Sequence, residues 1–161
     1  MCRWQNTMTF IYQTGVRYTE LMTARWTDIR TIRGRPSLVV RCRSAKMHRE
    51  RIIPLTDIAQ QVLQDMPRQD GVEEIFHFPH NEKTLRKYRR KIADAAGVTP
   101  KRSGFHAIRR LVGTLVGAAS LVLGHRRSDV TLAYYQAADR IGTELDKLPK
   151  LHARKEVAFG Y

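Results

Sequence analysis

Apolar and polar residues alternate along the chain in two ways, with a strand-like period in one early stretch and a helical period elsewhere. Residues 7–13 are apolar and aromatic and are followed by Gly15, which predicts a helix that ends at this glycine. Residues 19–28 carry apolar side chains at helical spacing and predict a short amphipathic helix. The first part of the chain is therefore expected to be helical.

Strand signals follow in three short runs. Residues 28–32 alternate, and residues 37–43 and 51–55 are rich in β-branched side chains. Turn-forming residues occur at 34–36, and residues 44–49 are expected to form the tip of the second hairpin. These runs predict a small three-stranded antiparallel sheet near the N-terminus.

The remaining residues predict helices. They are expected to begin near Thr56, Asn81, Phe105 and Ser128, with a last helix or turn over residues 139–148. The apolar stripe of the helix after Asn81 includes Tyr88, which is expected to point inward. Because the sheet precedes the helices instead of alternating with them, the pattern indicates an α+β fold that is mostly α-helical.

The composition adds a strong positive charge to this picture. The chain has 161 residues, with 29 Lys and Arg against 15 Asp and Glu, which is a formal net charge of +14. Its length and its 42% hydrophobic content suit one globular domain. A charge excess of this size indicates a polyanionic partner, most commonly nucleic acid, although some basic proteins are simply basic.

Several classes of protein do not fit the sequence. No apolar run approaches the roughly 18 residues of a membrane span, and no signal peptide opens the chain. Cys2 and Cys42 do not make a disulfide framework, which indicates an intracellular protein. A phosphate-binding glycine loop is absent, and His77 with His80 is too small a set to predict zinc. No cofactor, metal or nucleotide is therefore expected.

One predicted helix is especially basic. Lys83, Arg86, Lys87 and Arg90 share one of its faces by their spacing of three and four residues. We predict that this face contacts DNA phosphates, and the alternative is a solvated helix face without a partner.

Three short motifs contain residues that suit phosphate chemistry. In chain order they contain Arg17, then His106 with Arg109, then His125 with Tyr134 nine residues later. Taken singly, these residues fit a surface arginine, a buried histidine and a core tyrosine. Taken together and in this order, they resemble the catalytic domain of the tyrosine recombinase, or phage integrase, family.

The resemblance extends through the predicted sheet. Lys46 stands eight residues before Pro54, at the place of the lysine in the family's hairpin. The match then runs from about Thr14 to Tyr135. It implies the tyrosine recombinase, or DNA breaking–rejoining, catalytic fold, with a single catalytic domain over residues 1–161.

The resemblance implies a set of residues around the scissile phosphate. Arg17 and Arg109 match the two arginines that bind it, and His125 matches a histidine that hydrogen-bonds it. Guanidinium groups suit this role because they stay charged at any working pH and offer a rigid donor fork to the charge of the transition state. Glu20 follows Arg17 by three residues, as in the family, and is expected to orient the arginine or the fold.

The other matches concern the nucleophile and the protons. Tyr134 matches the nucleophile, and the family's nine-residue interval selects it over Tyr135. A tyrosine of pKa about 10 is ionised to roughly one part in a thousand at pH 7, so a cationic pocket and a nearby base are needed. His106 matches the acid/base histidine, and Lys46 matches the lysine that protonates the leaving 5′-oxygen.

The resemblance implies site-specific DNA recombination or integration, as by a mobile element, through a 3′-phosphotyrosyl intermediate and without metal or ATP. The implied partners are double-stranded DNA and further copies of the chain, as a homotetramer on DNA. Residues 139–161 would pack either on a neighbouring protomer or on their own domain. Two other functions stay open, namely type IB topoisomerase-like relaxation of DNA and a DNA-binding module with an inactive site.

The chain departs from the family's pattern in two places. The interval from Arg109 to His125 is shorter than usual, so either a segment is truly deleted or a further stretch is missing from the chain near residues 117–121, and we expect the second. Family members also commonly carry an N-terminal DNA-clamping domain, to which nothing here corresponds. We therefore expect an isolated catalytic fragment of a longer protein.

Overall fold

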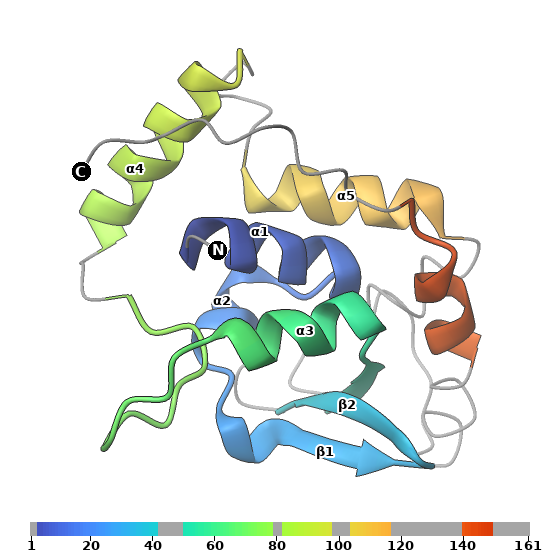
Figure 1. Ribbon diagram of the computed structural model, residues 1–161. Coiled ribbons are helices and arrows are strands. Elements are labelled where there is room, and N and C mark those ends of the chain that lie inside the picture. Colours follow the sequence, from blue (N-terminus) through green and yellow to red (C-terminus); the bar gives the residue numbers. More distant parts are fainter. Residues whose placement is uncertain (1–2, 42–49, 79–81, 98–103, 117–139, 150–161) are drawn as a thin grey trace.

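The structure is a computed structural model that describes residues 3–41, 50–78, 82–97, 104–116 and 140–149. Its elements are, in order, α1 (Arg3–Thr14), α2 (Tyr18–Met22), the 3₁₀ helix η1 (Trp26–Asp28), β1 (Ile29–Ile32), β2 (Arg35–Val40), β3 (Arg51–Pro54), α3 (Asp57–Asp65), α4 (Glu82–Ala95) and α5 (Phe105–Leu115). A further helix covers residues 140–146. Figure 1 shows α1 between α5 on one side and α3 on the other, with the sheet beyond α3.

Helix α1 is the centre of the core because both of its sides are covered. Phe10 and Ile11 have no exposed surface, and the Phe10 ring packs against Phe76 with ring centroids 5.0 Å apart. The helix stops at Gly15, whose φ of 61° lies in the left-handed region, and the Gly15 N–H donates to the carbonyl of Ile11 at 2.8 Å. The predicted end of this helix is confirmed, and its first residue lies earlier than the apolar pattern indicated.

The three strands form the predicted antiparallel sheet, in the order β1–β2–β3. Ile32 pairs with Arg35, so residues 33 and 34 alone connect β1 to β2, with φ values of 51° and 75°. Two successive positive φ values make the tight hairpin turn whose twist matches that of the strands. The turn therefore lies at 33–34 instead of the predicted 34–36, and Pro36 belongs to β2 because its fixed φ is compatible with a strand.

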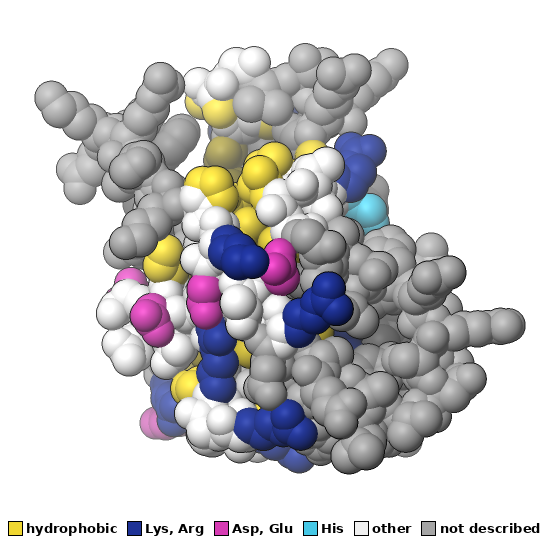
Figure 2. Space-filling view, turned by 90° about the vertical axis from the view of Figure 1, so that its right-hand side faces the viewer, with side chains coloured by type: hydrophobic (Ala, Val, Ile, Leu, Met, Phe, Trp, Pro, Cys, Tyr) yellow, Lys and Arg dark blue, Asp and Glu magenta, His cyan; other side chains and the backbone are white. Residues whose placement is uncertain are grey.

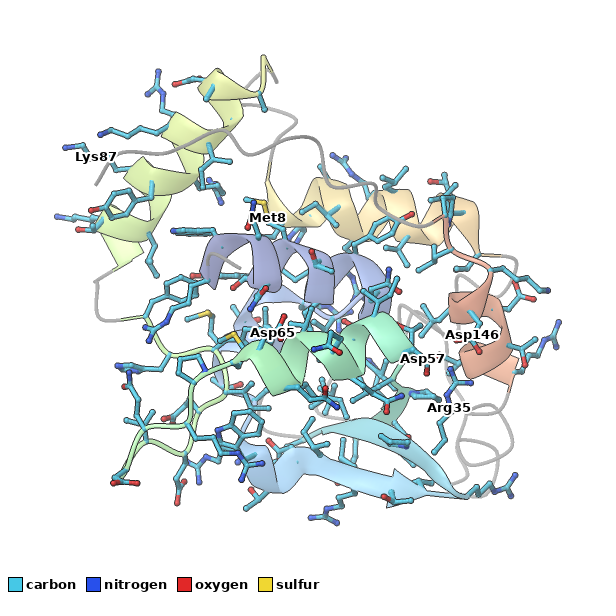
Figure 3. All side chains as sticks on the ribbon, viewed as in Figure 1. Met8, Arg35, Asp57, Asp65, Lys87 and Asp146 are labelled. Carbon is cyan, nitrogen blue, oxygen red and sulfur yellow. The ribbon has the colours of Figure 1, made fainter. Side chains whose placement is uncertain are left out.

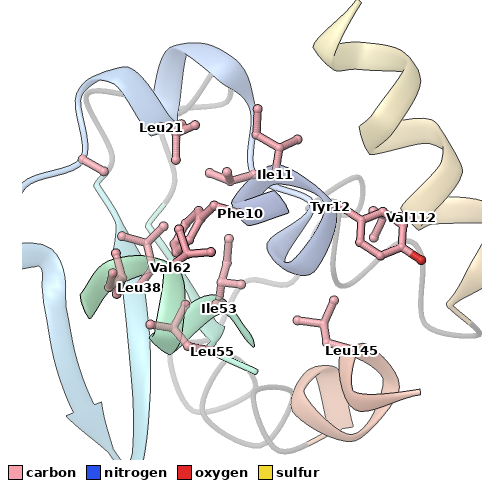
Figure 4. Close-up of a cluster of buried hydrophobic side chains, with 14 of the residues drawn as sticks. Phe10, Ile11, Tyr12, Leu21, Leu38, Ile53, Leu55, Val62, Val112 and Leu145 are labelled. Carbon is pink, nitrogen blue, oxygen red and sulfur yellow. The ribbon is translucent and has the colours of Figure 1, made fainter. Parts of the chain in front are cut away.

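Helix α3 closes the core over the sheet. Its first turn is capped as predicted, since the Ala59 N–H donates to Thr56 Oγ1 at 3.1 Å. Val62 of α3 belongs to the same buried cluster as Leu38 of β2 and Ile53 of β3 (Figure 4). The sheet and α3 therefore bury their apolar faces together, and α1 covers the other side of α3.

The segment 140–149 packs against the rest of its own chain. Ile141, Leu145 and Leu148 are buried members of the central hydrophobic cluster. An ion pair joins Asp146 Oδ1 to Arg35 Nη2 at 2.7 Å, and the two side chains point toward each other in Figure 3. Of the two expected partners for this part of the chain, its own domain and a neighbouring protomer, the structure shows the first for residues 140–149.

The main expectations for the fold are confirmed, with one helix and one side chain predicted wrongly. Residues 19–28 do not form one helix, since α2 ends at Met22 and Trp26–Asp28 form the separate 3₁₀ helix η1, because Arg25 is extended and pairs with Glu74. Tyr88 is 39% exposed, whereas it was expected inward, and Leu85 of the same helix is buried as the apolar stripe predicts. A tyrosine can lie at such a boundary because its hydroxyl is polar. The hairpin tip at 44–49, the interval 117–121 and the helix expected at Ser128 lie outside the described residues. Within the described residues, no helix has the length and apolar character to cross a bilayer.

Candidate active site

The first residue of the site lies at the start of α2. The backbone N–H of Arg17 donates to Glu20 Oε2 at 2.9 Å, which caps the helix, and its guanidinium Nη1 donates to Glu20 Oε1 at 2.8 Å. The Glu20 side chain has no exposed surface, whereas 15% of the Arg17 side chain is accessible. Glu20 therefore orients Arg17, one of the two roles expected for it, and the Arg17 side chain stays partly accessible.

A third residue, Arg51, completes this arrangement and was not among the predicted site residues. It is the first residue of β3, and its Nη1 and Nη2 donate to the two oxygens of Glu20 at 2.9 and 2.5 Å. Both side chains are buried. The available sequence signal was a charged residue at the head of a short, otherwise apolar strand, and this signal alone does not name a partner.

Arg109 approaches the same place from α5. Its side chain is buried, and its Nη1 donates to the carbonyl oxygen of Gly15. This contact requires the chain to leave α1 at Gly15, where the left-handed φ turns the backbone toward Arg17. The structure thus brings Arg17 and Arg109, predicted from two separate motifs, into one arginine cluster with Arg51. We call Arg17, Arg51, Arg109 and Glu20 the arginine cluster.

The pKa of Glu20 shows how strongly the cluster favours its charged form. Burial of the carboxyl group acts to raise the pKa, but hydrogen bonds and charge attraction from Arg51, together with hydrogen bonds from Arg17, outweigh it. The net effect lowers the pKa from 4.5 to about 2. Glu20 is therefore a carboxylate at neutral pH and not a proton donor.

For Arg109, unlike Glu20, the surroundings disfavour the charged form. Burial and, to a smaller extent, repulsion from Arg17 and Arg51 lower its pKa, while attraction to Glu20 raises it, and the net effect is a pKa lowered from 12.5 to about 10. The cluster contains three guanidinium groups and one carboxylate, which Arg17 and Arg51 bind, so positive charge is in excess. An anion placed beside Arg17 and Arg109 would relieve this repulsion, which makes the cluster a candidate phosphate-binding site.

An aromatic stack holds the two motifs against each other. The Tyr18 ring lies parallel to the Phe105 ring, with centroids 4.4 Å apart and planes inclined by 3°. Trp4 of α1 also stacks on Phe105, with centroids 6.1 Å apart. Tyr18 follows Arg17 in the chain and Phe105 precedes His106. The stack therefore fixes the start of α2 relative to the start of α5.

Of the other predicted catalytic residues, the structure describes only His106. His106 lies on α5 one turn before Arg109, and it is exposed. Lys46, His125 and Tyr134 lie outside the described residues, as does His80. In the described ranges, His, Cys, Asp and Glu side chains do not gather in groups of three or more that would suit a metal ion.

The basic helix lies to one side of the arginine cluster. Lys83, Lys87 and Arg90 of α4 are exposed, and Lys87 points away from the core in Figure 3. The side chain of Arg86 is not among the described ones. Arg89 of α4 lies over the Phe105 ring, 5.8 Å from its centroid, which links the helix to the aromatic stack. By contrast, basic and acidic side chains are mixed on the face of the molecule that Figure 2 shows.

Comparison with known protein families identifies the family of the chain. The sequence pattern of the phage integrase family matches residues 1–140. The chain belongs to the phage integrase family. This match confirms the resemblance inferred from the sequence, and its range includes the positions of the three motifs. A search of curated proteins finds no significant match.

Solved structures agree with this membership at the level of the fold. The chain is similar to the XerH site-specific recombinase bound to its difH substrate in a pre-cleavage complex, with 16% identity and a TM-score of 0.58 over 87% of the chain. It is also similar to the Tn1549 transposon integrase in complex with circular intermediate DNA, with 18% identity and a TM-score of 0.52 over 88% of the chain. The chain spans 42% and 57% of these two structures. The predicted catalytic-domain fold of the tyrosine recombinases is therefore confirmed.

Proposed function

We propose that the protein is a tyrosine recombinase that carries out site-specific recombination or integration of DNA. The observation that carries the proposal is the convergence of Arg17 and Arg109 on one carboxylate-supported cluster with excess positive charge. Such a cluster matches a phosphodiester, whose non-bridging oxygens gain negative charge when a nucleophile attacks. Membership of the phage integrase family supports the same reaction.

In the proposed reaction, the phenolic oxygen of Tyr134 attacks the scissile phosphorus while Arg17 and Arg109 bind the non-bridging oxygens and His125 adds a hydrogen bond. The bond from phosphorus to the 5′-oxygen breaks, and Lys46 gives that oxygen a proton. His106 is the acid/base group for the tyrosine proton. The phosphotyrosyl ester retains the energy of the broken bond, so a 5′-hydroxyl of a second strand can attack it and release Tyr134 without ATP, metal or another cofactor.

Double-stranded DNA is the proposed partner, and of the two structures compared above one is bound to its difH substrate and the other to circular intermediate DNA. Each copy of the chain offers one nucleophile, whereas exchange between two duplexes breaks four strands. We therefore propose a homotetramer on DNA, acting in the cytoplasm at the nucleoid. Lys83, Arg86, Lys87 and Arg90 of α4 are proposed to bind the phosphates that flank the cleavage site.

Neutralising the exposed face of α4 is expected to weaken DNA binding and to make it less sensitive to salt. For the triple substitution Lys83→Ala, Lys87→Ala and Arg90→Ala, the slope of log affinity against log salt should fall by about one unit per lost phosphate contact, because fewer counterions are released. Fluorescence anisotropy with labelled duplex DNA between low and moderate salt measures this slope.

A matched triple variant controls for the loss of net charge. Arg30, Arg33 and Lys147 are exposed elsewhere in the structure, and their replacement removes the same charge from the chain. This control should leave the salt slope close to that of the unchanged protein. An equal loss of slope in both variants would contradict a specific role for α4.

The proposal also differs from two other functions in its products. A duplex library with randomised arms and a central nick traps covalent adducts, and sequencing the trapped DNA identifies the preferred site. With that site, a recombinase yields a covalent adduct and joined products from two duplexes. Relaxation of supercoiled DNA without recombinant product would favour a topoisomerase. Binding of the selected site with no adduct would favour an inactive DNA-binding module and would contradict the proposal.

A further inference from the structure

The buried pair of Arg51 and Glu20 has a geometry that a simple structural ion pair does not require. Arg51 occupies both oxygens of the carboxylate, and Arg17 Nη1 shares one of them, Oε1, at 2.8 Å. In the described part of the molecule, the buried Nε of Arg51 has no hydrogen-bond partner. The Arg51 guanidinium is thus oriented so that Nη1 and Nη2 bind Glu20, while its Nε–H is left without a partner.

We propose that Arg51 is a positioning residue that balances the charge of Glu20 and thereby keeps the guanidinium of Arg17 available to the scissile phosphate. The inference rests on the proposed function, in which Arg17 binds that phosphate. Arg51 acts through Glu20 and does not itself touch the substrate.

The physical reason is competition for one carboxylate. Glu20 is buried, so its charge is poorly screened and demands cationic partners. With Arg51 in place, a bidentate pair satisfies that demand, and Glu20 holds Arg17 through one guanidinium nitrogen and the backbone N–H. Without Arg51, Arg17 would become the main counter-charge of Glu20, and its positive potential toward an incoming phosphate would fall.

The position of Arg51 in the fold gives this pair a second consequence. Arg51 opens β3 and follows directly after the hairpin residues that carry Lys46. Glu20 lies on α2, so the pair ties the strand at the base of the hairpin to the helix that begins after Arg17. One buried contact therefore joins the strand that follows the Lys46 segment in the chain to the helix that follows Arg17.

The test compares four proteins in single-turnover formation of the covalent adduct on a nicked duplex, namely the unchanged protein, Arg51→Met, Glu20→Gln and the double variant. Melting temperature and DNA affinity are measured for each. Arg51→Met should be slower by about tenfold or more, with nearly unchanged DNA affinity. Removing the charge of Glu20 in the same background should restore the rate, so the double variant should match Glu20→Gln within about threefold.

Slower cleavage by Arg51→Met at a temperature where its melting curve shows it fully folded, with DNA affinity unchanged, is a result that loss of a merely structural contact does not produce. Rescue in the double variant then assigns the slower rate to the unbalanced charge of Glu20. A double variant as slow as Arg51→Met would overturn the inference, and so would an unchanged rate in Arg51→Met. If Arg51→Met does not fold, the double variant is compared with Glu20→Gln instead, because the double variant leaves no unpaired charge at this position. A slower rate in the double variant than in Glu20→Gln would then contradict the inference. Arg35→Met, which removes another paired arginine of the same sheet, should cleave normally. Absence of an adduct with the unchanged protein would refute the proposed function instead.

Discussion

Replacement of Arg17 by alanine is expected to slow formation of the covalent protein–DNA adduct by about two to three orders of magnitude. Arg17 offers guanidinium donors at the partly accessible side of the arginine cluster, where the phosphate would gain charge in the transition state. Binding to the remaining DNA backbone uses other cations, so the affinity for intact duplex should change by only a few fold. A single-turnover cleavage assay and an anisotropy titration measure the two quantities separately.

The chain contains a close counterpart for use as a control. Arg25 begins the 3₁₀ helix η1 with the same local geometry, since its backbone N–H donates to Asp28 Oδ2 at 2.9 Å, as that of Arg17 does to Glu20. Its guanidinium pairs with Glu73 away from the arginine cluster. Arg25→Ala should therefore cleave normally. Equal losses of cleavage in the two variants would contradict a specific role for Arg17.

Acid is expected to destabilise the protein through Glu20. Its pKa is about 2 in the folded state, lower than the usual 4.5, so the folded state favours the ionised form. The stabilisation is fully present above pH 4.5 and is lost as the pH falls toward 2, with a magnitude of about 3 kcal/mol in the free energy of unfolding. Urea unfolding at a series of pH values from 7 to 2 measures this change.

A difference between variants isolates the contribution of Glu20 from that of other carboxylates. Glu20→Gln should lose about 3–5 kcal/mol at pH 7, because it leaves buried Arg51 without its anion, and it should show a weaker dependence on pH below 4.5. Asp146→Asn breaks the half-exposed pair with Arg35 and should cost no more than about 1 kcal/mol. A pH dependence in Glu20→Gln equal to that of the unchanged protein would contradict the low pKa of this carboxyl group.

Much of the fold could be predicted because its signals are local. The glycine that ends α1, the threonine that caps α3 and the β-branched runs of the sheet each act within a few residues. The hairpin turn was less accurately placed, since a glycine, an arginine and a proline in a row allow more than one register. Tyr88 was misplaced because an amphipathic side chain fits both the inner and the outer edge of a helical stripe.

The candidate site was predicted from motifs and not from contacts. Arg17 and Glu20 are three residues apart, so a single turn of helix brings them together. The contact of Glu20 with Arg51 spans 31 residues, and that of Arg109 with Gly15 spans 94. Such pairs depend on how α2, β3 and α5 pack, which residue spacing alone does not specify. For this reason the sequence predicts a strand that begins at Arg51 but does not assign Arg51 to the site.

The central claim is that a tyrosine of this chain becomes covalently joined to DNA, and mass spectrometry of the trapped adduct tests it most directly. The adduct formed on the selected nicked duplex is digested with protease and nuclease, and the peptide that retains a nucleotide is sequenced. We expect a 3′-phosphotyrosyl linkage at Tyr134, lost in Tyr134→Phe and retained in Tyr135→Phe. A linkage at Tyr135 or at another residue, or an adduct that persists in Tyr134→Phe, would contradict the account.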